Sequence, residues 1–220
     1  MNEFGLSEIS DGSLLGADTT KVEKAIEESF VDAWMVCAKE IPRSWFYGIS
    51  FKDSEIVPNL GNGTGHVILP DNFYLLSSFM MEGWNKPVYD AELENENILS
   101  VQTNEYTRGN VVRPVCTISS EVVGEKSERV LNYYSLPRGL SEHIIEKAIY
   151  IPIVTPLTEL KDTDKLNVNV QTIEPLAYLT ASIVFTLFEK YDLAKSLENQ
   201  ATRLFPGLLT AKGTTIITKQ

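Results

Sequence analysis

The sequence predicts an α+β fold: an N-terminal helix, a mostly antiparallel β-sheet insertion, a C-terminal helix hairpin and an extended tail. Three observations predict it. Apolar residues recur at helical spacing near the start of the chain and again in its last fifty residues. Between these regions, short runs rich in β-branched and aromatic residues alternate with turn residues. Short consecutive strands of this kind favour an antiparallel sheet.

The first part of the chain predicts an arm followed by one helix. Residues 1–19 are rich in glycine, serine and acidic residues and are expected to form a flexible arm. A helix is expected from Thr20 to Glu40, and Pro42 ends it. Residues 43–65 are expected to be irregular. The apolar positions that predict the helix are Val22, Ile26, Phe30, Ala33, Trp34 and Cys37.

The sheet is expected within residues 66–155, as part of a single domain that spans residues 20–205. Residues 82–109 are polar and are expected to form a loop. Glycine, proline and charged residues separate the β-prone runs. Strands are predicted at residues 66–69, 73–81, 111–123, 130–136 and 144–154.

The last third predicts a helix pair over residues 173–205. Glu174 and Pro175 are expected to open the first helix, because proline is favoured in a first turn. A second apolar stripe begins at Leu193, and Pro206 ends it. Residues 206–220 are expected to form a tail that contains a β-prone segment from Thr214 to Ile217.

The charge balance argues against a free nucleic-acid-binding protein. The chain has 19 basic and 30 acidic residues, a net charge of -11, whereas such proteins usually carry a basic face. Residues 171–220 are nearly neutral, with 5 basic and 4 acidic groups, which indicates a different environment for the C-terminal part. The start of the sequence, Met1 to Gly16, has neither the basic region nor the apolar stretch of a signal peptide, and the apolar run from Leu176 to Phe188 is too short to span a bilayer. A soluble protein made in a reducing cytoplasm is therefore expected.

Residues that commonly carry catalysis or bind metals are few. Cys37 and Cys116 are expected to be buried thiols. His66 and His143 lie far apart in the sequence and outside any zinc-ligand spacing, so both are expected at strand ends on the surface. No catalytic, metal or cofactor site is therefore predicted, and no cofactor is expected.

Two sequence blocks resemble head-to-tail adaptor proteins of tailed bacteriophages, also called connector or ring proteins. The run from Leu69 to Leu76, continued from Met81 to Val88, resembles their "LPDDF" and "GW–x–RPV" motifs, with Asn72 where an acid is common and Lys86 in place of arginine. The run from Arg129 to Pro137 resembles their "Y-Y-x-L-P" strand end. The order of helices and strands also matches over residues 20–205, and the ring proteins of crAss-like phages are similar in character.

The resemblance implies a structural virion protein without catalysis. Such subunits form a homo-oligomeric ring, commonly a dodecamer, that docks on the portal protein, extends the channel for double-stranded DNA and receives tail or further ring proteins. Glu92, Glu94 and Glu96 are then candidates to line the lumen, where they would repel phosphate. Interface candidates are Trp84 and Lys86, together with Thr214, Thr215, Ile216 and Ile217, which can add a strand to a neighbour's sheet.

Several alternatives remain open at the level of sequence. Trp84 is as well explained as a core residue, and the tail as an end without a partner. The chain can also be another phage tail component, such as a stopper or tail-tube protein, or a non-viral protein-binding module. A hydrolase that uses Cys116 or His143 would need a pocket with a perturbed titrating group.

Overall fold

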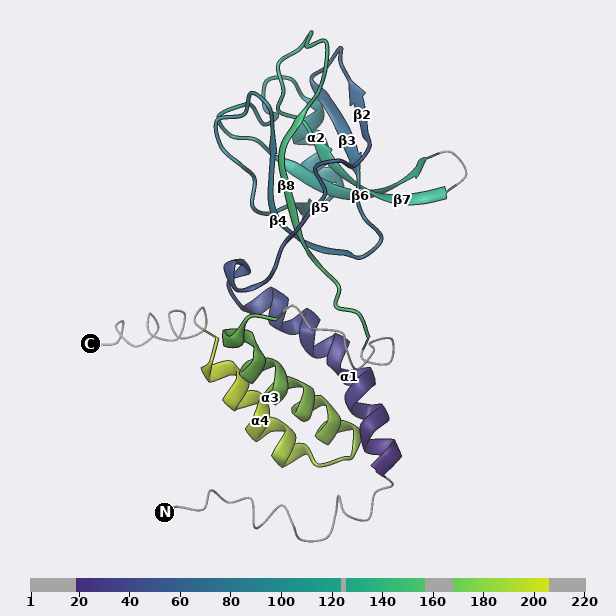
Figure 1. The fold of residues 1–220 in the computed structure, drawn as a ribbon. Helices are drawn as coiled ribbons and strands as arrows, with labels where there is room; N and C mark the ends of the chain where they lie inside the picture. The colour runs from purple at the N-terminus through teal and green to yellow at the C-terminus, as the bar shows by residue number, and fades with distance from the viewer. Residues whose placement is uncertain (1–18, 124–125, 157–167, 206–220) are drawn as a thin grey trace, which may run out of the picture. The chain divides into compact units, whose positions relative to one another are not determined.

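The computed structural model describes residues 19–123, 126–156 and 168–205 (Figure 1). It has the α+β architecture that the sequence predicts. The chain divides into two compact units. The β unit spans Gly48–Ile153, and the helical unit is built from the chain before Gly48 and after Ile153. The predicted arm, apart from Thr19, and the predicted tail 206–220 lie outside the described residues.

The described residues of the helical unit form three long helices. These are α1 (Thr19–Glu40), α3 (Val170–Leu187) and α4 (Tyr191–Arg203), with a short 3₁₀ turn, η1 (Arg43–Trp45), after α1. Helix α3 lies between the other two and forms a hairpin with α4 (Figure 1). The Ser182 hydroxyl donates to the Ala194 carbonyl at 2.8 Å and joins the two helices of the hairpin. The buried apolar residues of α1 include Phe30, Ala33, Trp34 and Cys37, as the helical spacing predicts.

The start of α3 differs from the prediction. The helix begins at Val170, because the Asn169 side chain accepts a hydrogen bond from the Gln171 amide at 3.1 Å and caps it. Pro175 therefore lies in the second turn of the helix and not in the first. The prediction rested on Pro175 and did not consider Asn169 as a cap.

The described strands of the β unit form two sheets. One has the strand order β1-β8-β4 and is antiparallel throughout. The other has the order β2-β3-β7-β6-β5 and is antiparallel except for the parallel pair β5 and β6. The strands are β1 (Ile49–Ser50), β2 (Ile56–Asn59), β3 (Thr64–Ile68), β4 (Phe73–Met81), β5 (Glu92–Leu93), β6 (Cys116–Val123), β7 (Lys126–Tyr133) and β8 (Ile145–Pro152).

One hydrophobic core includes residues from both sheets. Phe73 and Tyr150 stack with ring centroids 5.5 Å apart, and Phe51 meets both rings edge-on. Val67, on β3, and Leu131, on β7, contribute to this core from the five-stranded sheet and are fully buried. Aromatic rings therefore supply much of the apolar area that holds the β unit together.

Two predictions about irregular segments were wrong. Residues 43–65 contain η1, β1 and β2, and residues 82–109 contain β5 and helix α2 (Glu96–Thr103). Strands of two to four residues are too short to show alternation, and Pro58 is tolerated in β2 because that strand lies at a sheet edge. Asn95 caps α2 by accepting from the Ile98 amide at 3.0 Å, a signal that the acidic residues around it obscured.

Candidate functional site

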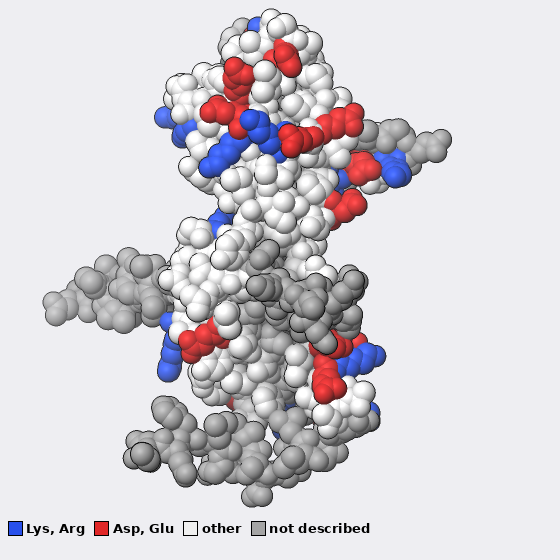
Figure 2. Space-filling model, in the orientation of Figure 1, with Lys and Arg blue, Asp and Glu red and all other residues white. Residues whose placement is uncertain are grey.

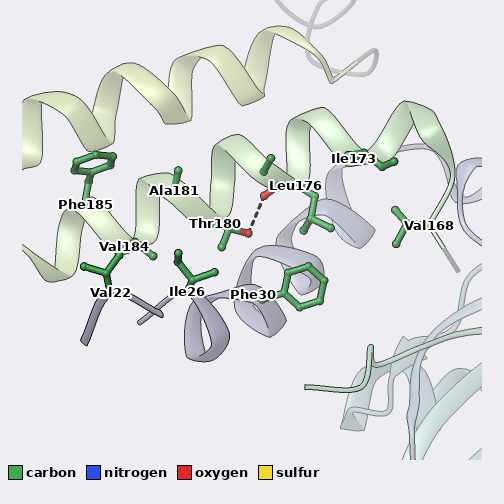
Figure 3. A pocket seen from close by; sticks show the side chains of 11 residues that line it. Val22, Ile26, Phe30, Val168, Ile173, Leu176, Thr180, Ala181, Val184 and Phe185 are labelled. Carbon is green, nitrogen blue, oxygen red and sulfur yellow. Dashed lines mark hydrogen bonds between the residues drawn. The ribbon is translucent and has the colours of Figure 1, made fainter. Parts of the chain in front are cut away.

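An apolar groove of about 580 Å³ lies along α1 and α3 in the helical unit (Figure 3). Val22, Ile26 and Phe30 face it from α1, and the opposite wall comes from α3 and from Val168 just before it. The two helices run antiparallel, so that Val22 lies opposite Val184 and Phe30 lies opposite Leu176 (Figure 3). The α3 residues are Ile173, Leu176, Ala177, Thr180, Ala181, Val184 and Phe185.

The described lining of the groove has almost no polar character. Thr180 is its one polar side chain, and the Thr180 hydroxyl already donates to the Leu176 carbonyl at 2.8 Å. No charged side chain is among the described lining residues. Ile173 is 53% exposed and Val170, one turn earlier, is 77% exposed. A groove of this kind binds apolar side chains, because it has no free polar group to recognise anything else.

Helix α3 is apolar on most of its circumference. By length and composition it is, among the described helices, the one that would also be able to cross a membrane. That is weak evidence, because an apolar core helix of a soluble protein meets the same criteria. The groove offers another explanation of why α3 is so apolar. One side of α3 packs inside the helical unit, and another lines a surface that is open in the described structure.

A polar cluster lies on the five-stranded sheet of the β unit. The Glu94 carboxylate oxygen Oε2 lies 2.8 Å from the Tyr134 hydroxyl, 3.0 Å from Asn132 Nδ2 and 3.1 Å from the Thr117 hydroxyl. The two hydroxyls are also 2.9 Å apart. Because each hydroxyl has a single proton, the two can satisfy two of these three oxygen–oxygen contacts at once. Burial is the largest of the causes that raise the pKa of Tyr134, so its phenol stays protonated.

The same cluster borders a hollow of about 360 Å³ on the sheet. His66 Nδ1 lies 3.3 Å from Glu121 Oε2, and both side chains line this hollow together with Glu94. Within the described residues, no group of three or more histidine, cysteine, aspartate or glutamate side chains has the geometry of a metal site. The contacts of Glu94 join β5 to β6 and β7, so they fix this sheet edge in place.

The predicted site residues differ in how exposed they are, and they do not form one site among the described residues. Trp84 is 4% exposed and packs edge-on against Phe79 with ring centroids 5.7 Å apart, which supports the core alternative over an exposed anchor. Lys86 is exposed. Residues 214–217 lie outside the described residues. Of the three glutamates, Glu92 and Glu96 are exposed, whereas Glu94 is half-buried in the polar cluster.

The cysteines and histidines are mostly enclosed. Cys37 and Cys116 are buried, as predicted, and burial raises the pKa of Cys37 to about 12 and also raises that of Cys116. The prediction that both histidines lie at strand ends on the surface was wrong. His66 is half-buried within β3, and His143 is 5% exposed, with its Nδ1 2.6 Å from the Tyr133 hydroxyl. Both thiols stay protonated at neutral pH, so neither is an activated nucleophile in this conformation.

Basic and acidic side chains are interspersed over the β unit on the face that Figure 2 shows, and this face has no continuous basic stripe. The groove was not predicted from the sequence, because helical spacing places Val22 and Ile26 on an apolar stripe without showing what covers that stripe. The available signal was the composition of α3, whose apolar residues cover more than one face.

Compared with known proteins, the sequence matches no protein-family description and no curated protein.

Proposed function

We propose that the chain is a structural subunit of a tailed-bacteriophage virion. In this proposal it forms a ring below the portal protein, joins head to tail and extends the DNA channel without catalysing a reaction. The order of the sequence blocks that resemble phage adaptors supports the proposal. The β unit inserted between α1 and the helix pair α3 and α4 supports it too, because the resemblance implies that arrangement.

The groove along α1 and α3 is the observation that carries the proposal. A subunit that works by assembly needs apolar surface for its partners, and the described lining of the groove is apolar apart from Thr180. A single copy would leave about 580 Å³ of this apolar groove open to water in the described structure. In a ring, each copy has neighbours whose side chains can fill it.

The charge of the chain fits a channel that DNA passes through. The net charge of -11 opposes tight binding of phosphate. The exposed carboxylates of Glu92, on β5, and Glu96, at the start of α2, are the side chains that we assign to the lumen. Glu94 has a different role in this proposal, since its carboxylate holds β5 against the sheet.

Electron microscopy of the full chain mixed with its portal protein tests the proposal, with each component alone as a control. The expected result is a ring of copies stacked on the portal, with Glu92 and Glu96 on the inner wall. A chain that remains monomeric and does not bind the portal would exclude the connector function and favour a protein-binding module that uses the same groove. A ring with both glutamates on the outer wall would exclude their assignment to the lumen but leave the connector function standing.

A further inference from the structure

The groove along α1 and α3 is open in the described part of the chain, and its surroundings are acidic. Helices α1 and α3 together carry three lysines and six acidic residues. Glu23 and Glu27 directly follow the lining residues Val22 and Ile26, so each lies about 100° around the helix from a groove-facing position. The surface therefore has an apolar floor beside carboxylates, and the complementary ligand is an apolar segment with basic residues.

The chain contains one segment of that composition outside the described residues. Residues 206–220 include the apolar pairs Leu208–Leu209 and Ile216–Ile217. They also include Lys212 and Lys219 and no acidic residue, within a chain whose net charge is -11. The segment thus matches the groove in both apolar character and charge.

The segment is also longer than the groove. Its 15 residues span at most about 50 Å when extended. The α3 wall of the groove, from Ile173 to Phe185, is about 18 Å long at the rise of an α-helix. About six extended residues cover that length. The other residues of the segment are then available to connect Phe205 to the docked part.

We infer that the groove along α1 and α3 of one copy binds the C-terminal segment 206–220 of a neighbouring copy, with Ile216 on the apolar floor and Lys219 near the acidic rim. The inference rests on the proposed function, because the ring supplies the neighbour. A donor segment and an acceptor groove at different places on one chain make a heterologous contact, and rotation can close such contacts into a ring. Each copy then gives one segment and receives one.

Disulfide cross-linking between two single-substitution variants tests this contact in the full chain. One variant carries Ala177→Cys in the groove, where Ala177 is exposed, and the other carries Ile216→Cys in the segment. The native thiols Cys37 and Cys116 are buried and give little background. After mixing and mild oxidation, with and without portal, the expected product is a dimer that joins residue 177 of one copy to residue 216 of another.

The matched control replaces Ala177→Cys by Gln200→Cys. Gln200 is exposed on α4, outside the described lining of the groove. Specific docking predicts at least about tenfold faster cross-linking at residue 177 than at residue 200, because docking raises the local concentration at one place only. Equal rates at the two positions, or no cross-link at residue 177 with portal present, would overturn the inference.

The double variant Ala177→Cys/Ile216→Cys distinguishes a neighbour's segment from the chain's own. Cross-linked chains of two or more copies support the inference, whereas a product of monomer mass would overturn it. Electron microscopy of the same samples separates the two proposals. Cross-linked copies that never bind the portal leave the inference standing and remove the connector function. Rings on the portal without the cross-link would support the connector function and overturn the inferred docking of the segment.

Discussion

The hydroxyl of Tyr133, on β7, lies 2.6 Å from Nδ1 of His143, and both side chains are buried. Burial lowers the pKa of His143 and raises that of Tyr133, so both groups are neutral in the folded protein near pH 7. The two rings also meet edge-on with centroids 5.5 Å apart. This pair ties the loop before β8 to the middle of the five-stranded sheet.

We expect Tyr133→Phe to lower the free energy of unfolding by about 1–3 kcal/mol, because it removes the hydrogen-bond partner of a buried imidazole nitrogen. Urea unfolding followed by tryptophan fluorescence measures the change. Tyr89→Phe is the matched control, since Tyr89 is 61% exposed, and it is expected to change stability by less than about 0.5 kcal/mol. Equal effects of the two substitutions would show that the buried contact contributes no stability.

We expect His143 to make stability depend on pH. Its pKa is lower in the folded chain than the ordinary value of about 6.5 in the unfolded chain. The unfolded state therefore binds the proton more readily, and this contribution to stability is complete above about pH 6.5 and is lost as the pH falls toward the folded pKa. His143→Gln cannot titrate, so the stability advantage of the native chain over this variant should shrink between about pH 7 and pH 5. An advantage that stays constant over this range would contradict the prediction.

We expect Glu94→Ala to destabilise the β unit by about 1–3 kcal/mol, because it leaves the donors of Asn132, Thr117 and Tyr134 without their shared acceptor. Glu92→Ala removes an exposed carboxylate two residues earlier and is expected to cost less than about 0.5 kcal/mol. Thermal unfolding of the two variants beside the native chain measures the difference. If Glu92→Ala proved the more harmful change, the structural role assigned to Glu94 would be wrong.

We expect Gly65→Ala to destabilise the protein by about 1–3 kcal/mol through overpacking. A Cβ atom at Gly65 would lie within 2.7 Å of the Val57 carbonyl oxygen and closer still to the Tyr133 hydroxyl. Gly61→Ala is the control in the same turn region, because its Cβ would meet nothing nearer than 3.8 Å. Chemical unfolding should show a lower midpoint for Gly65→Ala and an almost unchanged one for Gly61→Ala.

We expect the two native cysteines to react slowly with a thiol reagent in the folded chain. Burial raises the pKa of Cys37 to about 12, so almost none of it is thiolate at pH 8, and Cys116 is also buried with a raised pKa. Labelling with a maleimide should be at least about a hundredfold slower in buffer than in denaturant. Fast labelling of either cysteine in buffer would mean that the surrounding core opens readily.

The long, periodic elements could be predicted from the sequence, and the short ones could not. Strand β4 has nine residues and was predicted at its observed bounds, and α1 was predicted within one residue of its start. Strand β5 pairs through Glu92 and Leu93 alone, so no local pattern reveals it. Its position depends on Glu94, whose partners Thr117, Asn132 and Tyr134 lie 23, 38 and 40 residues away in the sequence.

The groove illustrates a second limit of the sequence. Helical spacing shows that Ile26 and Leu176 belong to apolar stripes, but it does not show whether another element covers them. Leu176 is buried, whereas Ile26 is 40% exposed although it belongs to the stripe that predicts the helix. Burial of a stripe depends on the elements that pack against it, and α3 packs against α1 but leaves part of its stripe exposed.

The insertion of the β unit also sets an order of events during synthesis. All of the β unit, Gly48–Ile153, is contiguous in the chain and can complete its own core as soon as it leaves the ribosome. Helix α1 emerges before the β unit but packs against α3, which begins about 130 residues later. At ordinary translation rates of about 5–20 residues per second, α1 waits on the order of ten seconds for that partner. During this interval its apolar stripe is a target for chaperones or for other nascent copies, so a helix made before the β unit is buried after it.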